Sequence, residues 1–99
     1  MDISASQLKQ RFANSETVNI LDVREELEFH TFNIGGDNIP LGNILRSIDE
    51  LDYNKHQEII VVCQHGLRSE TARRVLEQHG FMNVKNLSGG LLAWRKLNH

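Results

Sequence analysis

The sequence predicts an α/β fold in which a small, mostly parallel sheet is flanked by helices on both faces. Residues 59–62 (Ile-Ile-Val-Val) are apolar at every position, which indicates a strand that is buried on both faces, as in a parallel sheet covered by helices. Strand-like and helix-like segments also alternate along the chain, which favours parallel strands joined by right-handed crossovers. Since 99 residues suffice for one core, we expect a single domain spanning 1–99.

The N-terminal part of the chain predicts a helix followed by a strand. Leu8 and Phe12 are four residues apart and form one apolar helix face, and a serine before them, Ser4 or Ser6, can cap the start of the helix. After a polar loop, the β-prone apolar residues of 18–23 predict the first strand.

The middle of the chain predicts short elements. Residues 25–30 have the acidic first turn of a helix, with Leu27 or Phe29 facing inward. Two glycines make 35–37 a turn, and the proline of 38–40 suits the end or edge of a strand. The next expected elements are a helix with Ile44, Ile48 and Leu51 on one face, followed by the central strand 58–62.

The C-terminal part of the chain predicts two helices with a strand between them. The first helix has Ala72, Val75, Leu76 and His79 on one face and Gly80 as its C-terminal cap. A strand at 84–87 and a turn at 88–90 follow, and the last helix contains Leu91, Leu92 and Trp94.

The loop after the central strand is the candidate functional site. Cys63 comes at the carboxyl end of that strand, where open α/β sheets bind their ligands. Loop N–H groups at a helix N-terminus bind anions, but the helix dipole adds only about 0.3–1 kcal/mol, so Arg68 is expected to supply much of the remaining stabilisation of a thiolate. Gly66 can adopt the positive φ of a tight loop. The pattern favours an activated thiolate in an anion cradle over a cysteine that only fills the core.

Composition excludes several function classes. The single cysteine excludes an intramolecular disulfide, a four-cysteine metal site and a redox pair within one chain, and the histidines lack metal-ligand spacing. A net charge of −2 without a basic patch argues against nucleic acid, and the chain has neither a long apolar stretch nor a signal pattern. We therefore expect a cytoplasmic protein with no metal, no cofactor, no nucleic-acid partner and no membrane partner.

The loop Cys63-Gln64-His65-Gly66-Leu67-Arg68-Ser69 resembles the active-site loop of rhodanese (thiosulfate sulfurtransferase) domains. Further segments match in the same order: Leu21-Asp22-Val23-Arg24-Glu25, Glu28-Phe29, Asn38-Ile39-Pro40, and Leu87-Ser88-Gly89-Gly90 with Trp94. The resemblance implies a rhodanese-like fold and a sulfurtransferase in which Cys63 is catalytic. Cys63 would take sulfane sulfur from thiosulfate or a persulfide donor and pass it, as a persulfide, to cyanide, a thiol or a sulfur-carrier protein.

The resemblance also assigns residues to the site. The residues expected to bind the substrate are Gln64, His65, Gly66, Leu67, Arg68 and Ser69, through their backbone N–H groups and the Arg68 guanidinium. Asp22 and Arg24 are expected near the pocket as a supporting ion pair. We interpret Ser69 as a helix cap and His65 as a solvent-facing residue. The acceptor is expected to be external, because no second cysteine could take the sulfur.

The sequence leaves three alternatives open, one for the donor and two for the function. Many thiosulfate-active members carry a basic residue directly after the cysteine, where this chain has the neutral Gln64, and this favours a persulfide or thiol donor. A protein-binding or sulfur-relay module on the same fold is a second interpretation. A cysteine phosphatase or arsenate reductase is a third and less favoured one, since those enzymes place five residues between cysteine and arginine and this chain places four between Cys63 and Arg68.

Overall fold

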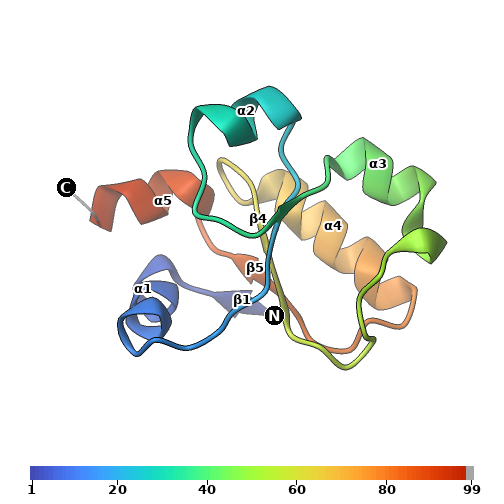
Figure 1. Ribbon diagram of the computed structural model, residues 1–99, viewed down its shortest axis with the longest axis horizontal. Helices are drawn as coiled ribbons and strands as arrows, with labels where there is room; N and C mark the ends of the chain where they lie inside the picture. Colours follow the sequence, from blue (N-terminus) through green and yellow to red (C-terminus); the bar gives the residue numbers. More distant parts are fainter. Residues whose placement is uncertain (98–99) are drawn as a thin grey trace.

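The computed structural model describes residues 1–97 and contains one sheet of five parallel strands in the order β1-β5-β4-β2-β3 (Figure 1). The strands are β1 (Asp2–Ile3), β2 (Ile20–Asp22), β3 (Asp37–Asn38), β4 (Ile59–Val62) and β5 (Val84–Leu87). The helices are α1 (Ala5–Ala13), α2 (Glu26–Thr31), α3 (Leu41–Arg46), α4 (Leu67–Gln78) and α5 (Gly90–Leu97), with a 3₁₀ turn η1 (Ile48–Glu50) after α3. The expected α/β class with a parallel sheet is confirmed, and positions 98–99 of the expected domain lie outside the described residues.

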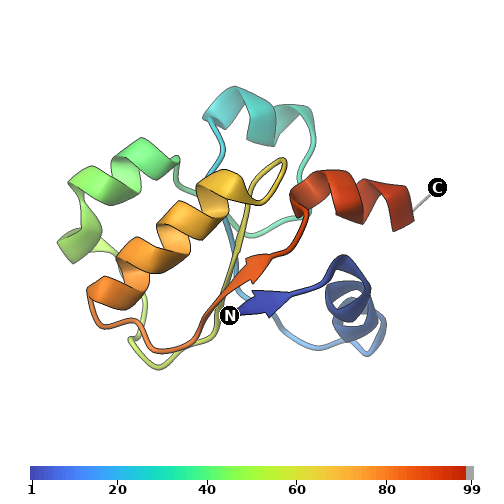
Figure 2. The same cartoon turned by 180° about the vertical axis from the view of Figure 1, so that it is seen from behind.

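Helices cover both faces of the sheet. α3 and α4 pack on one face and α1 and α5 on the other, as the front and back views show (Figures 1 and 2). Successive side chains of a strand point to opposite faces, so Ile59 and Val61 enter the core under α4 while Ile60 and Val62 enter the core under α1 and α5. This two-sided burial explains why every position of β4 is apolar.

The first helix forms as its sequence pattern predicts. Ser4 is the cap: its Oγ accepts the Gln7 N–H at 3.0 Å, and the Gln7 side chain accepts the Ser4 N–H at 2.8 Å. Leu8 is fully buried, and Phe12 meets the Trp94 ring edge-on with ring centroids 5.4 Å apart. The apolar face of α1 thereby packs against the sheet and α5.

The helix predicted across residues 44–51 is two shorter elements. α3 ends at Arg46, and Ser47 adopts φ −127° and ψ 33°, which lies outside the α-helical region and breaks the helix before η1. Ile44, Ile48 and Leu51 still pack into the core under α4, as their spacing predicts. The prediction of a single helix was therefore wrong, but the inward face was correctly assigned.

α2 covers the carboxyl end of the sheet rather than one of its faces. It lies above the loop that follows β4, at the end where the strands finish (Figures 1 and 2). Of the two residues expected to face inward, Leu27 is 80% exposed and Phe29 is half-buried, so Phe29 is the inward one. The position of α2 matters for function, because it places the acidic first turn of α2 beside the Cys63 loop.

Candidate active site

The Cys63 thiol lies in a cradle of backbone N–H groups. Cys63 follows β4 directly, and its Sγ accepts hydrogen bonds from the N–H groups of Gly66 at 3.1 Å and Ser69 at 3.3 Å. The loop is tight because Gly66 adopts φ +93°, a left-handed conformation that favours glycine. Gly66 is also the N-cap of α4, so the positive end of the helix dipole faces the sulfur. This geometry stabilises negative charge on Sγ.

Ser69 is not the helix cap that the sequence predicts. It is the third residue of α4 and fully buried, and its Oγ lies 3.2 Å from Cys63 Sγ. Its hydroxyl donates to Oδ1 of Asn86 on β5, and Nδ2 of Asn86 donates to the Gly66 carbonyl at 3.1 Å. Sequence reasoning missed Asn86, although a polar residue at an inward position of a buried strand was a signal that could have identified it.

The turn between β5 and α5 closes one side of the loop. The N–H groups of Leu91 and Leu92 donate to the carbonyls of Cys63 at 2.9 Å and Gln64 at 3.0 Å. This approach requires a glycine at position 90, since a Cβ there would lie 2.4 Å from the Gln64 oxygen and 2.5 Å from the Cys63 oxygen. The start of α5 therefore fixes the backbone on which the thiol is carried.

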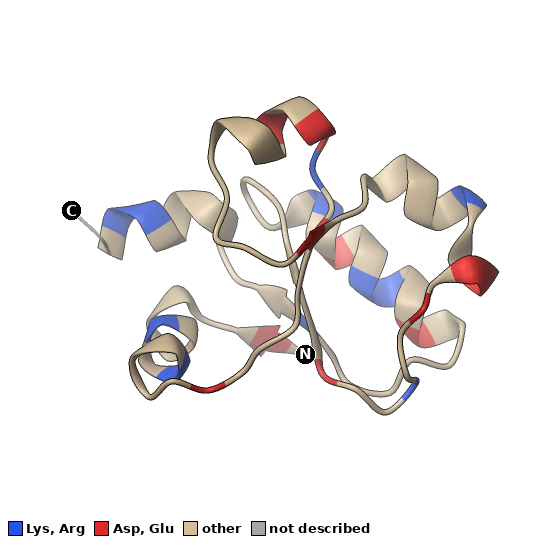
Figure 3. Cartoon of the chain, viewed as in Figure 1, with Lys and Arg blue, Asp and Glu red and all other residues tan. Residues whose placement is uncertain are grey.

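Arg68 is paired with a carboxylate of α2. Its two terminal nitrogens donate to Glu28 at 2.7 and 3.0 Å, so the pair is bidentate. The hydrogen bonds from Arg68 lower the pKa of Glu28 to about 2, and those same bonds raise the pKa of Arg68. Arg68 also interacts electrostatically with Cys63. In Figure 3, acidic residues at the start of α2 and a basic residue at the start of α4 lie at this same end of the molecule.

Asp22 and Arg24 form the buried ion pair that was expected near the loop. The Arg24 guanidinium donates to both carboxylate oxygens of Asp22, at 2.8 to 3.2 Å, and to the Phe32 carbonyl at 2.6 Å. Through the bond to Phe32, the pair connects the end of β2 to the segment after α2. Arg24 also lines a cavity of about 320 Å³, together with Gln64, Arg95 and residues of the α2 segment.

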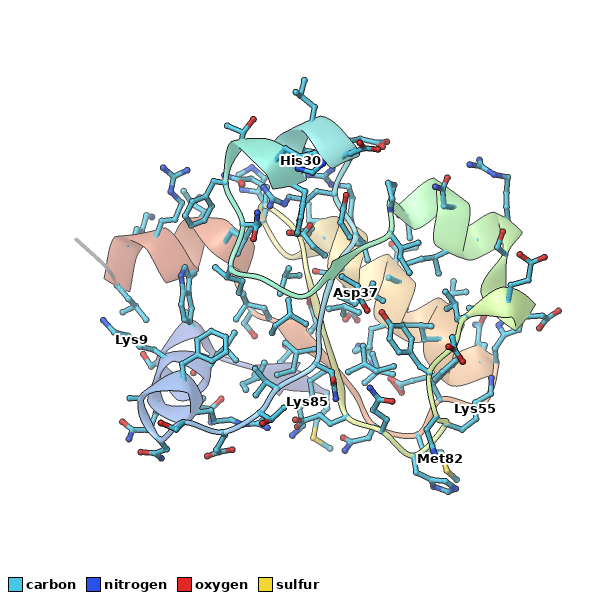
Figure 4. All side chains as sticks on the ribbon, viewed as in Figure 1. Lys9, His30, Asp37, Lys55, Met82 and Lys85 are labelled. Atoms are coloured by element: carbon cyan, nitrogen blue, oxygen red, sulfur yellow. The ribbon has the colours of Figure 1, made fainter. Side chains whose placement is uncertain are left out.

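The other loop residues divide between this cavity and solvent. Gln64 is half-buried and lines the cavity, whereas His65 and Leu67 are exposed, as we interpreted for His65. In Figure 4 the labelled His30 marks α2, while Lys55 and Met82 lie at the opposite edge of the molecule, where the Met82 N–H donates to the Lys55 carbonyl at 2.8 Å. Within residues 1–97 no group of three or more His, Cys, Asp or Glu is arranged to hold a metal ion. Along the same stretch, every helix is too short or too polar to span a bilayer.

Comparison with known sequences gives consistent matches. The profile of the family described as Rhodanese-like domain matches residues 4–97. The chain is 33% identical, over 97% of its length, to the thiosulfate sulfurtransferase GlpE of Shewanella oneidensis, of which it covers 93%. It is also 33% identical over 96% of its length to a sulfurtransferase of Allochromatium vinosum, covering 88% of that protein. A Bacillus subtilis protein, YrkF, is 39% identical over 94% of the chain, which spans only 50% of YrkF.

Solved structures match over nearly the whole chain. A rhodanese-like domain protein from Staphylococcus aureus superposes with a TM-score of 0.82 at 30% identity, covering 95% of this chain and 91% of that one. The rhodanese-like domain of the Anabaena sp. protein Alr3790 superposes with a TM-score of 0.86 at 26% identity, covering 97% of this chain and 74% of that one. The fold is therefore that of known rhodanese-like domains.

Proposed function

Because the chain belongs to the rhodanese-like domain family, we propose that residues 1–99 form one sulfurtransferase domain that carries sulfur on Cys63 as a persulfide. The observation that carries the proposal is the position of Cys63 Sγ, which accepts the N–H groups of Gly66 and Ser69 at the carboxyl end of the central strand. Backbone donors and a helix N-terminus favour the thiolate, which is the nucleophilic form of cysteine.

The proposed reaction has two displacement steps. With thiosulfate, the Cys63 thiolate attacks the outer sulfur; an S–S bond forms to Sγ, the sulfur–sulfur bond of thiosulfate breaks, and sulfite leaves with the bonding pair. With a persulfide donor, the outer sulfur transfers in the same way and a thiolate leaves. In the second step an acceptor thiolate, or cyanide, attacks the outer sulfur of the Cys63 persulfide and restores the Cys63 thiolate. Charge and atoms balance in each step without a cofactor.

The acceptor in this proposal is an external molecule. Cys63 is the single cysteine of the sequence, so a persulfide on it cannot be discharged into an internal disulfide. Cys63 is 1% exposed, so the acceptor has to reach the sulfur at the loop. A small thiol or a sulfur-carrier protein has the required chemistry.

Two residues bear on the choice of donor. We assign Arg68 the role of binding the anionic part of the donor, yet its charge is compensated by Glu28. The residue directly after the cysteine, Gln64, is uncharged. The binding of a donor with less negative charge than thiosulfate depends less on a positive charge at positions 64 and 68. We therefore include a persulfide of a thiol among the proposed donors.

The test is the intact mass of the protein after incubation with thiosulfate and, separately, with a thiol persulfide. We expect a gain equal to one sulfur atom, lost on addition of a thiol and absent in Cys63→Ser, which changes one atom of a buried side chain. A gain only from the persulfide would identify the donor class. No gain from either reagent would overturn the carrier role and leave a protein-binding module on this fold.

A further inference from the structure

Cys63 is connected to β5 by a short chain of buried side chains. Ser69 lies between Cys63 and Asn86, and the exposed fractions of the three residues are 0% for Ser69, 1% for Cys63 and 6% for Asn86. Asn86 reaches this position because it shares a face of β5 with Val84, the face that packs under α4. A change at Asn86 can therefore reach the sulfur without contacting it.

The direction of each hydrogen bond in the chain follows from what its atoms can donate. The Gly66 carbonyl only accepts, so the nitrogen Nδ2 of Asn86 must face it, at 3.1 Å. The oxygen Oδ1 of Asn86 then faces Ser69. Because a carbonyl oxygen cannot donate, the single hydrogen of the Ser69 hydroxyl is used in the hydrogen bond to Oδ1. Ser69 Oγ is left with lone pairs alone to present to Cys63 Sγ, 3.2 Å away.

A lone pair at this position suits a thiol and not a thiolate. Protonated Cys63 can donate its S–H to Ser69 Oγ, in addition to accepting the backbone N–H groups of Gly66 and Ser69. A thiolate gains the hydroxyl as a third donor only if the hydroxyl turns away from Asn86. That turn would leave the buried Oδ1 of Asn86 without the partner it has, which carries a free-energy cost.

We propose that Asn86 is a positioning residue that competes with the Cys63 thiolate for the hydroxyl hydrogen of Ser69. The role rests on the proposed use of Cys63 as the nucleophile. In a persulfide, the inner Sγ is bonded to two atoms and carries no formal charge, so the Ser69 hydroxyl can remain with Asn86. The competition therefore costs the free thiolate a donor while leaving the sulfur-loaded form unaffected, and it favours the loaded carrier.

Other charged groups near the site are left unchanged by the test. They are Arg68 on α4, Glu28 on α2, Asp22 and Arg24 at the end of β2, His65 in the loop and Arg95 on α5, whereas Lys85 points to the face of β5 opposite Asn86. Arg68 interacts with Cys63 and is paired with Glu28, while Lys85 binds Glu58. Because the substitutions below alter none of these side chains, a change in the thiol reports on the Ser69–Asn86 pair.

The experiment measures the rate of Cys63 alkylation by iodoacetamide as a function of pH, in the unmodified chain, Asn86→Leu, Ser69→Ala and the double variant. Alkylation needs no sulfur donor, so the result is independent of whether the protein transfers sulfur. Leucine has the same branching at Cγ and the same number of side-chain heavy atoms as asparagine but no Oδ1, so the Ser69 hydroxyl becomes free to donate to the thiolate. We expect the midpoint of the pH profile to fall and the rate below it to rise about fivefold, the size of one net hydrogen bond.

The double variant separates this role from a merely structural one. In the Ser69→Ala background, Asn86→Leu should leave the profile unchanged. An unchanged or raised midpoint in Asn86→Leu overturns the proposal. So does an equal shift in the Ser69→Ala background, since Asn86 would then act through the Gly66 carbonyl. If circular dichroism shows that Asn86→Leu does not fold, Asn86→Ala replaces it with the same expectations.

Discussion

The Arg68 guanidinium donates two hydrogen bonds to the Glu28 carboxylate, at 2.7 and 3.0 Å, and so connects the start of α4 to α2 across the candidate active site. Their side chains are 38% and 37% exposed, so the pair is solvated and can separate. Glu28 is ionised at neutral pH, and the hydrogen bonds from Arg68 lower its pKa further, from 4.5 to about 2. The positive charge that we assign to donor binding is therefore compensated in the resting protein.

Removing the charge of Glu28 should strengthen the binding of thiosulfate. In Glu28→Gln, Arg68 keeps its position but loses its anionic partner, so we expect the KM for thiosulfate to fall about fivefold, the effect of one solvated ion pair. Steady-state transfer to cyanide measures it. Glu26→Gln is the matched control, because Glu26 lies on the same helix with an 80% exposed side chain and should leave KM unchanged. A KM that stays constant or rises in Glu28→Gln would contradict the idea that Glu28 weakens thiosulfate binding by compensating the charge of Arg68.

Removing Arg68 should have the opposite effect on donor binding. In Arg68→Ala the donor loses a charge-assisted hydrogen bond, and we expect KM for thiosulfate to rise about tenfold with a smaller change in kcat. Arg68→Lys keeps the charge without the bidentate fork and should fall between the two. The same steady-state measurement distinguishes the three proteins. Equal KM values in all of them would remove Arg68 from the donor site.

The parts of the site that the sequence predicts are those set by local chemistry. The uniformly apolar run 59–62 indicates a strand buried on both faces, and Cys63 must then lie at its carboxyl end. Gly66 supplies the positive φ of the loop, and its place before α4 follows from the helical pattern after it. These inferences need only neighbours in sequence, and the structure contains both features.

The parts that the sequence does not predict depend on distant contacts. Glu28 and Asn86 lie 40 and 17 residues from their partners Arg68 and Ser69, and no local pattern encodes those distances. β1 has two residues and exists because it pairs with β5, so its propensity alone is uninformative. Ser69 has the sequence of a cap, but the tight loop moves the cap to Gly66 and turns Ser69 toward the sulfur.

Acid should weaken the fold through Glu58. Its pKa is lowered to about 2 by hydrogen bonds from Arg11 and then Lys85, from an ordinary value of 4.5. Because the folded-state pKa is the lower one, the stabilisation is fully present above pH 4.5 and is lost as the pH falls toward 2. We expect Glu58→Gln to lower the free energy of unfolding by about 1–2 kcal/mol at neutral pH, and by less as the pH approaches 2.

Urea unfolding across this pH range measures the effect of Glu58→Gln. Glu50→Gln is the control, since Glu50 is exposed in η1 and should change the free energy of unfolding by less than about 0.5 kcal/mol. A difference between Glu58→Gln and the unmodified chain that is independent of pH would show that Glu58 contributes through packing and not through its charge.

Gly90 should be essential because of how closely its backbone approaches the loop. An alanine Cβ would lie 2.4 Å from the Gln64 oxygen and 2.5 Å from the Cys63 oxygen, and these backbone atoms can move only if the bonds from Leu91 and Leu92 break. We expect Gly90→Ala to cost about 3 kcal/mol or more and to abolish sulfur loading of Cys63 in the folded fraction.

Gly35→Ala separates this clash from backbone strain alone. Gly35 also has a positive φ, +96°, but nothing lies within 4 Å of the position its Cβ would take. Gly35→Ala should lower the free energy of unfolding by about 1–2 kcal/mol and leave the sulfur loading of Cys63 intact. Thermal unfolding and intact mass after loading measure both quantities in each variant. If folded Gly90→Ala loads sulfur as well as Gly35→Ala does, the start of α5 does not hold the thiol in place, and the N–H groups of Gly66 and Ser69 suffice to position it.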